Sequence, residues 1–239
     1  ERDFFAWVNQ WSIMVKKPSD IGFSDEGYDL PPLTVNRHIV HNTRQWSIGG
    51  QNALFAMAAQ TMTEVREEQK LTVKERCEKA AELAAGKTSV YWCNLNEESA
   101  LLSKLDPEAM EIQGGMSIDR KEELLFAFSK GQIKRLVTKA KMTGMGLNWQ
   151  HCNHTVFFPT WSFEQRYQAF RRFWRFGQKR EVVVEEVISD GQQRVIEAID
   201  QKTQKSIELY GNLVAATNRT FTNAVRGFDS KVQLPGFLK

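Results

Sequence analysis

Short apolar runs alternate with helical patterns from residue 87 onward, and this alternation constrains the fold more than any other feature of the sequence. Strands separated by helices are typical of a parallel sheet with helices packed on its faces. We therefore predict an α/β fold whose sheet carries helices on both faces. The predicted strands are residues 89–93, 110–113, 133–138, 154–158 and 181–189. The predicted helices are residues 97–105, the segment between Ser117 and Gly131, residues 163–176 and residues 191–217.

The first 85 residues are patterned less regularly. Apolar residues recur at helical spacing over residues 1–15, and residues 17–32 are rich in Pro, Gly, Ser and Asp, which is typical of a loop. We predict a strand at 33–41, a connector at 42–50, and helices at 51–67 and 72–85. Asn96 is the expected cap of the helix that follows, and Gly177 is expected to end the helix at 163–176. The last 20 residues are expected to form a weakly ordered tail.

Composition narrows the function only slightly. The net charge of +3 permits a nucleic-acid partner, but a local basic patch would have to bind it. Three widely spaced cysteines fit a reducing compartment without a disulfide framework, so we expect a cytoplasmic protein. No apolar run is long enough for a membrane span, and we expect no membrane partner.

One stretch, residues 168–178 (QAFRRFWRFGQ), concentrates arginines and aromatic residues. If it is helical, Arg172 and Arg175 share a face, and Gln168 lies one turn earlier on that face. Adjacent guanidinium groups repel each other, and the planar fork of arginine suits phosphate, so this face favours an anion. The alternative is a solvated basic face whose aromatic residues pack into the core.

Several other patterns fail as functional motifs. Gly86-Lys87-Thr88 follows a helix and precedes a strand, which is the reverse of a P-loop, so we interpret it as the end of a helix. His151-Cys152-Asn153-His154 lacks the spacing of a zinc site, and we expect no metal there. Gly144-x-Gly146 lacks the third glycine of a dinucleotide fingerprint.

Two segments resemble blocks of a known family when they are taken together. The pattern Gln168-Ala169-x-x-Arg172-x-x-Arg175-x-Gly177-Gln178 is similar to motif VI of superfamily 2 helicases in the Swi/Snf branch. Residues 139–148 (KAKMTGMGLN) resemble motif V, which ends GxGLN. The segments at residues 148–152 (NWQHC) and 174–178 (WRFGQ) look closest to phage or prophage DEAD/DEAH-type helicases. The resemblance covers roughly residues 1–190.

The resemblance implies a RecA-like lobe. It assigns residues 42–190 to the second RecA-like lobe of a two-lobed motor and residues 1–41 to a helix–strand remnant of the first lobe and its crossover. Residues 191–239 would form a C-terminal helical extension. The P-loop Lys and the Walker-B acid pair of such motors do not occur in these 239 residues. We therefore expect a fragment of a longer protein, inactive without an N-terminal RecA-like lobe.

The resemblance also implies roles for individual residues. ATP and Mg²⁺ would lie between two lobes, with Arg172 and Arg175 reaching the γ-phosphate as catalytic arginine fingers. No nucleotide is expected to stay bound to this lobe by itself. The cofactor-binding residues would be Gly144, Gly146, Asn148 and Gln168. Lys139 and Lys141 would contact the phosphate backbone of DNA, which we expect to be duplex DNA rather than RNA.

The sequence departs from the family pattern at a few positions. Trp174 stands where His is usual, and Lys139 and Ala140 stand where Ser and Thr are usual. An alternative function therefore stays open at this stage: a non-catalytic α/β module, derived from a helicase lobe, that binds nucleic acid or protein.

Overall fold

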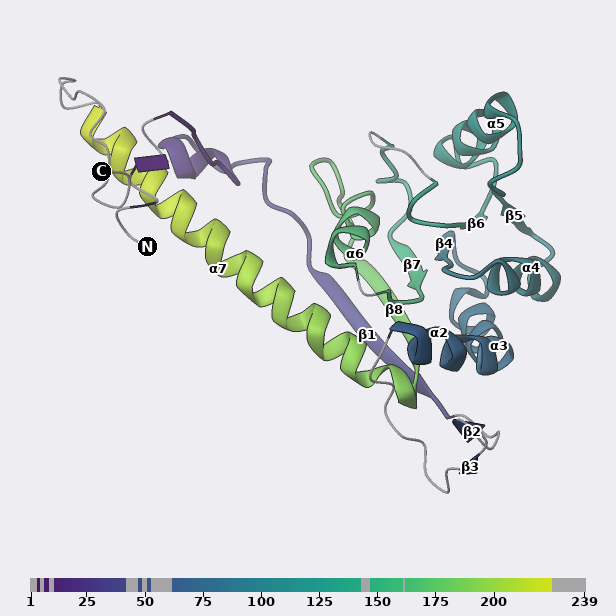
Figure 1. The fold of residues 1–239 in the computed structure, drawn as a ribbon. Helices are drawn as coiled ribbons and strands as arrows, with labels where there is room; N and C mark the ends of the chain where they lie inside the picture. The colour runs from purple at the N-terminus through teal and green to yellow at the C-terminus, as the bar shows by residue number, and fades with distance from the viewer. Residues whose placement is uncertain are drawn as a thin grey trace. The chain divides into compact units, whose positions relative to one another are not determined.

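The computed structural model describes residues 4, 7–8, 11–41, 47–48, 51–52, 62–142, 147–160 and 162–224. The chain divides into two compact units (Figure 1). The larger unit spans Leu30–Ile199, and the smaller combines Glu1–Asp29 with Asp200–Lys239. The predicted boundaries at residues 41 and 190 stay predictions.

The larger unit is built on one six-stranded sheet in which every recorded pairing is parallel. Its strand order is β1-β8-β7-β4-β6-β5. The strands are β1 (Leu33–Val40), β4 (Ser89–Trp92), β5 (Ala109–Glu111), β6 (Arg135–Thr138), β7 (His154–Phe157) and β8 (Val182–Ser189). All residues of β4, β6 and β7 are buried, as expected for parallel strands covered on both faces.

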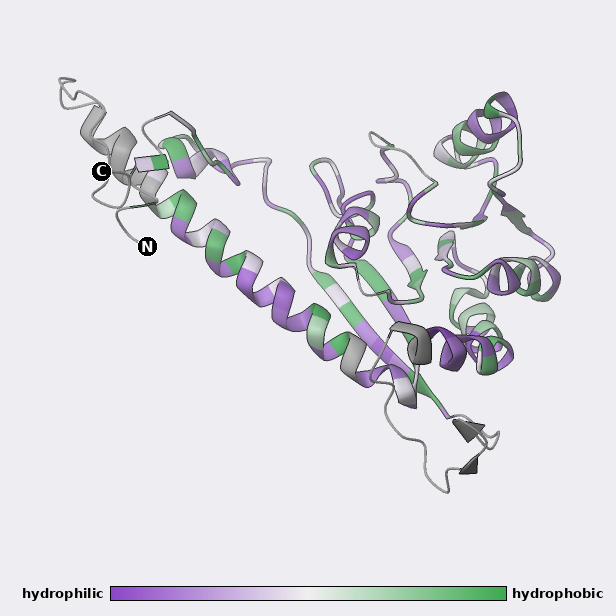
Figure 2. Cartoon of the chain, viewed as in Figure 1, coloured by the Kyte–Doolittle hydropathy of each residue, from purple (hydrophilic) through white to green (hydrophobic). Residues whose placement is uncertain are grey.

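Helices cover both faces of this sheet, as the alternation predicted. The helices are α2 (Met62–Leu71), α3 (Val73–Ala84), α4 (Asn96–Leu105), α5 (Ile118–Ser129), α6 (Phe163–Phe170) and α7 (Gln193–Ala224). Successive residues of a strand point to opposite faces, so Trp92 packs with α5 and α6 while Tyr91 packs with α3 and α4. Figure 2 shows that α3, α4 and α5 each carry hydrophobic and hydrophilic residues, consistent with one face on the sheet and one in water. The predicted α/β fold class is confirmed.

The most consequential error of the sequence analysis concerns the predicted helix at 163–176. The helix α6 ends at Phe170, with Arg171 as its C-cap, and residues 171–177 form consecutive turns. Phe173 is 0% exposed and contacts the rings of Trp92 and Trp149, and the backbone N–H of Trp149 donates to the carbonyl of Arg172 at 3.0 Å. Burial of Phe173 and this backbone bond hold the chain in turns where the local pattern favoured a helix. Gly177 ends the turns, rather than a helix, at a φ of 91°.

Smaller corrections concern the ends of helices. Asn96 is the first residue of α4, and the cap position is Leu95; the carboxylate of Glu98 accepts the backbone N–H groups of Asn94 and Leu95. Ser117 caps α5, and its side chain accepts the backbone N–H of Arg120 at 3.3 Å. Gln51 and Asn52 form a short strand, β3, paired with β2 (Ser47–Ile48), where a helix was predicted.

The turn at Gly86 follows α3 and precedes β4, with a φ of 72°, which confirms that Gly86-Lys87-Thr88 is no P-loop. The remainder of the predicted helix at 51–67 before residue 62 lies outside the described residues. In the predicted helix at 1–15, residues 4, 7 and 8 are helical, residues 11–15 are not, and the others lie outside the described residues.

The smaller unit joins the two ends of the chain. The smaller unit contains a 3₁₀ helix, η1 (Pro18–Ile21). Its N-terminal end is stabilised by Asp20, whose carboxylate accepts the backbone N–H groups of Lys16 and Lys17. The backbone N–H of Met14 donates to Thr217 of α7 at 3.2 Å. The helix α7 runs to Ala224, so the predicted tail begins within it. No helix among the described residues is long and apolar enough to cross a membrane.

Candidate functional site

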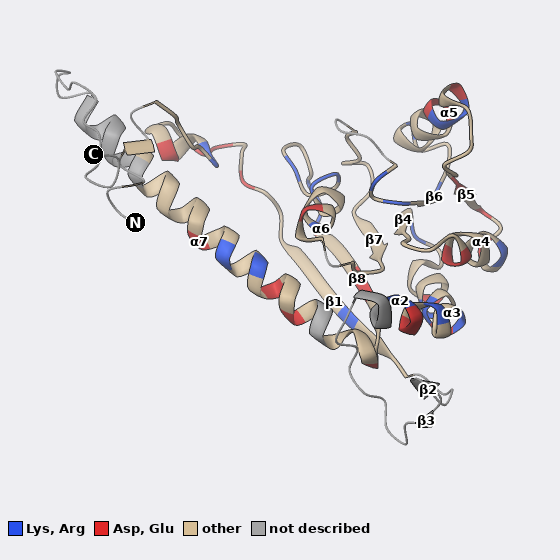
Figure 3. Ribbon diagram, in the orientation of Figure 1, with Lys and Arg blue, Asp and Glu red and all other residues tan. Residues whose placement is uncertain are grey.

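The turns after α6 and the segment after residue 146 form the walls of one cavity of about 360 Å³, which we call the arginine pocket. Its lining residues are Leu147, Tyr167, Gln168, Arg171, Arg172 and Arg175. Helix α6 positions Tyr167 and Gln168, and the turns position the three arginines. Figure 3 shows Lys and Arg gathered on the chain that leaves α6. The arginine pocket therefore brings Arg172, Arg175 and Gln168 together, although no continuous helix links them.

Tertiary contacts fix the turns that carry the arginines. Gln178 lies at their end, and its side-chain amide donates to the carbonyls of Cys152 at 3.1 Å and Phe173 at 3.3 Å. The indole of Trp174 donates to the carbonyl of Pro31 at 2.7 Å. Gln178, which belongs to the motif VI pattern, thus stabilises the turns by linking two backbone carbonyls. Phe170 and Phe173 are buried and Trp174 is half-buried, which confirms their predicted packing role.

The electrostatics of the arginine pocket favour an anion. Arg172 is 7% exposed, and burial, followed by the positive charge of Arg175, lowers the pKa of its guanidinium group. Arg175 donates to the carbonyl of Leu147 at 3.5 Å. None of the described residues lining the pocket is acidic. A ligand with several negative oxygens would relieve the repulsion between these cations.

Of the remaining cofactor-binding predictions, Asn148 alone belongs to the part of the chain that the structure describes. Gly144 and Gly146 lie outside the described residues. Asn148 is exposed and is not among the residues that line the arginine pocket. Sequence reasoning missed Tyr167, Arg171 and Leu147, and the pairing of Arg171 with Arg172 in the sequence was the one signal that could have found any of them.

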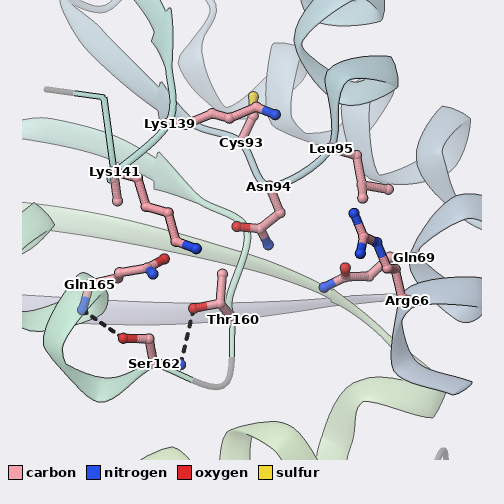
Figure 4. Close-up of a pocket in the computed structure, with 11 residues that line it drawn as sticks. Arg66, Gln69, Cys93, Asn94, Leu95, Lys139, Lys141, Thr160, Ser162 and Gln165 are labelled. Atoms are coloured by element: carbon pink, nitrogen blue, oxygen red, sulfur yellow. Dashed lines mark hydrogen bonds between the residues drawn. The ribbon is translucent and has the colours of Figure 1, made fainter. Parts of the chain in front are cut away.

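A second cavity, of about 440 Å³, lies at the carboxyl ends of β4, β6 and β7, and we call it the strand-end pocket. Its lining residues are Arg66, Gln69, Cys93, Asn94, Leu95, Lys139, Ala140, Lys141, Thr160, Ser162 and Gln165. Figure 4 shows Lys141 on one side, Arg66 and Gln69 from α2 on the other, and Asn94 between them. The described lining contains cations, amides and hydroxyls but no carboxylate. In open α/β sheets, ligands bind at this edge, where parallel strands end.

The walls of the strand-end pocket are held by hydrogen bonds from the side chains that line it. Asn94 donates to the carbonyls of Phe158 at 2.9 Å and Pro159 at 3.1 Å, and Gln69 donates to Pro159 at 3.3 Å. The ammonium group of Lys139 donates to the side-chain oxygen of Asn96 at 2.6 Å, whereas Lys141 is exposed. Both predicted lysines therefore line one pocket, together with Arg66, which sequence reasoning missed because it lies 73 residues before Lys139.

Metal and thiol chemistry find no support among the described residues. They hold no group of three or more His, Cys, Asp or Glu side chains placed to bind a metal ion. Burial raises the pKa of the Cys77 and Cys152 thiols to about 12, and it raises the pKa of Cys93 well above its usual value. The thiols are therefore protonated at neutral pH.

Comparison with known proteins agrees with this geometry. Residues 66–177, which contain both pockets, match the family described as the helicase conserved C-terminal domain. The chain also aligns with the DNA repair and recombination protein RAD54 of Saccharomyces cerevisiae, at 30% identity over 111 residues. That alignment covers 45% of this chain and 12% of the yeast protein, so the chain spans a small part of its relative.

These two matches support the predicted resemblance to the C-terminal lobe of a superfamily 2 helicase. Two solved structures are also similar to part of this chain. The C-terminal part of the Fun30 ATPase domain has a TM-score of 0.43 at 17% identity, with 53% of this chain and 44% of that chain covered. A DEAD box protein from Methanococcus jannaschii has a TM-score of 0.47 at 15% identity, with 55% of this chain and 37% of that chain covered.

Proposed function

We propose that this chain is the C-terminal lobe of an ATP-dependent DNA helicase or translocase of the Swi/Snf type. The observation that carries the proposal is the arginine pocket, because a helicase C-terminal domain here presents three guanidinium groups to one cavity without a carboxylate among its described lining. The resemblance of residues 148–152 to phage or prophage helicases supports an origin in such a gene as part of this proposal.

In this proposal, the triphosphate of ATP enters the arginine pocket from a first RecA-like lobe. That lobe would hold Mg²⁺ and the phosphate cradle, and the chain would be inactive without it. Arg172 and Arg175 would neutralise the charge that develops on the γ-phosphate oxygens in the transition state. Gln168, which lines the same pocket, would couple nucleotide binding there to the nucleic-acid groove.

The strand-end pocket is the proposed contact with nucleic acid. Lys139, Lys141 and Arg66 would bind backbone phosphates, which gives affinity without sequence specificity. The relative named for DNA repair and recombination supports DNA over RNA. Duplex DNA is the proposed substrate, because motors of the resembled branch track the backbone of a duplex.

DNA-stimulated ATP hydrolysis by the two-lobed protein tests this function. Arg172→Ala or Arg175→Ala is expected to reduce turnover by about 10³–10⁵-fold, which is typical of an arginine finger. Lys179→Ala is the matched control, since Lys179 is exposed and lies outside the lining of the arginine pocket. Wild-type turnover in both arginine variants would instead indicate a non-catalytic module that binds DNA or protein.

A further inference from the structure

Arg171 also lines the arginine pocket, and aromatic rings hold it in place. Its guanidinium carbon lies 4.6 Å from the ring centroid of Trp174 and 5.2 Å from that of Tyr167. Tyr167 precedes Arg171 by one turn of α6, and Trp174 follows it in the turns. The break of the helix after Phe170 therefore creates this stack of Tyr167, Arg171 and Trp174.

Stacking occupies the faces of a guanidinium group but leaves the N–H groups at its edge available. One of these groups donates to the carbonyl of Trp174 at 3.5 Å, which is a long hydrogen bond. The Nε atom is buried and has no hydrogen-bond partner among the described residues. Arg171 forms no ion pair with a described carboxylate.

Two other stacked arginines of this unit show what is unusual about Arg171. Arg76 lies 5.0 Å from the ring centroid of Phe158 and binds Glu98 at 2.5 Å. Arg166 lies 5.4 Å from that of Phe170 and binds Glu186 at 2.6 Å. Each combines an aromatic face with a carboxylate at its edge. Arg171 also contacts aromatic rings, but it lines a cavity and has no carboxylate partner among the described residues.

We infer that Arg171 is a third phosphate-binding guanidinium of the arginine pocket, positioned by Tyr167 and Trp174, and that its ligand is the polyphosphate chain of a nucleotide. This inference rests on the proposed function, because it takes the pocket shared with Arg172 and Arg175 as the phosphate site. A triphosphate offers enough oxygens for three forks, so three cations around one cavity match it in charge and in donor geometry.

Binding of inorganic tripolyphosphate to the 239-residue chain, measured by calorimetry at low salt, tests the inference without relying on turnover. Arg171→Ala is expected to weaken binding about tenfold, the order of one hydrogen bond between charged groups. Arg171→Lys keeps the charge but loses the planar fork, and it is expected to stay several-fold weaker than wild type. Tyr167→Leu removes one face of the stack at a 41%-exposed position and is expected to cost about two- to threefold. Lys179→Ala should bind as wild type.

The outcomes separate this inference from the proposed function. If Arg172→Ala weakens tripolyphosphate binding while Arg171→Ala matches Lys179→Ala, the role of Arg171 is overturned and the phosphate pocket stands. If the wild type fails to bind, or no pocket variant differs from Lys179→Ala, the phosphate pocket itself is overturned. Full affinity in Arg171→Lys would overturn the role of the fork. Loss of duplex DNA binding in Arg171→Ala, with tripolyphosphate binding intact, would identify a nucleic-acid phosphate as the ligand and overturn the inference.

Discussion

Arginines in two regions of the larger unit have opposite surroundings. Around the sheet, Arg76, Arg135 and Arg166 each meet a buried or largely buried carboxylate, at 2.5 Å from Glu98, 2.5 Å from Asp106 and 2.6 Å from Glu186. In the arginine pocket, the described lining has no carboxylate, and Arg171 and Arg175 form no ion pair with a described one.

The contrast separates arginines paired with carboxylates in the fold from the arginines that we propose bind a ligand. A buried cation without a counter-charge is costly, so a fold that uses arginine for stability supplies an acid or a backbone oxygen. Arg76 is an extreme case, because it also donates to the hydroxyl of Thr72 and the carbonyl of Gln69. Where guanidinium groups line a cavity that has no carboxylate among its described lining, a ligand can supply anionic oxygens.

Breaking the Arg76–Glu98 pair is expected to give the largest effect on stability. Arg76→Ala leaves the Glu98 carboxylate buried with one partner fewer, so the free energy of unfolding should fall by about 3–5 kcal/mol, measured by urea denaturation. The double variant Arg76→Met with Glu98→Gln removes both charges but keeps an acceptor for the N–H groups of Asn94 and Leu95, and it should recover part of the loss. A loss below about 1 kcal/mol in the free energy of unfolding of Arg76→Ala would show that the Arg76–Glu98 pair does not stabilise the fold, and the comparison would fail.

Acid should destabilise the unit through His154, which lies at the start of β7. Its ring nitrogens lie 2.9 Å from the hydroxyl of Ser89 and 3.2 Å from the ammonium of Lys87. Burial, followed by the charge of Lys87, lowers its pKa to about 4. Between pH 6.5 and 4 the unfolded chain binds a proton that the folded chain does not, so stability falls as pH falls, by up to about 3 kcal/mol.

His154→Gln should flatten this dependence, measured as the free energy of unfolding from pH 7 to pH 4. The exposed His41, changed to Asn, serves as the control. An unchanged pH profile in His154→Gln would show that the histidine is not the group responsible. The result matters for the comparison because His154 is a buried base kept neutral, whereas Arg172 is a buried cation kept charged.

The strand-end pocket should show a moderate effect on DNA affinity. Lys141→Ala removes one cation, so the slope of log K against log salt concentration should become shallower by about 0.9, measured by fluorescence anisotropy with a short duplex. Lys139→Ala should change the slope less, because Asn96 already accepts a hydrogen bond from this lysine. Equal slopes for Lys141→Ala and the control Lys179→Ala would remove Lys141 from the proposed DNA contact.

The smallest expected effect is the most discriminating. Arg175→Gln should change the free energy of unfolding by no more than about 0.5 kcal/mol, as for a substitution outside the structural network. The change should tend toward stabilisation, because Arg175 is one of the charges that lower the pKa of Arg172. Urea denaturation measures it beside Arg76→Ala. A loss of the size seen in Arg76→Ala would mean that the arginine pocket is structural and that the comparison fails.

The sequence predicted the sheet well because the signal for its strands is local. Apolar runs of strand length, separated by helical patterns, specify a parallel sheet buried on both faces, and the strand predicted at 33–41 is observed as β1 beside β8. The turn at Gly86 was predicted from chain order alone. Arg172, Arg175 and Gln168 were identified by their spacing, and they do line one pocket.

What the sequence could not show depends on contacts between distant residues. The pattern of residues 163–176 favours a helix throughout, and the helix stops at Phe170 because Phe173 is buried against Trp92 and Trp149, two residues far away in the chain. Arg66 joins the strand-end pocket for the same reason.

The sequence by itself therefore determined the α/β fold and identified Arg172 and Arg175, but not Arg171, among the arginines that line one pocket. Only the tertiary structure decided which arginines are neutralised by carboxylates and which line a cavity. Residue spacing shows which side chains one segment carries. The carboxylate that pairs with each of the three structural arginines lies on another segment, 20 to 29 residues away. Packing brings those partners together, and it also places Arg171 against the rings of Tyr167 and Trp174 in the lining of the arginine pocket.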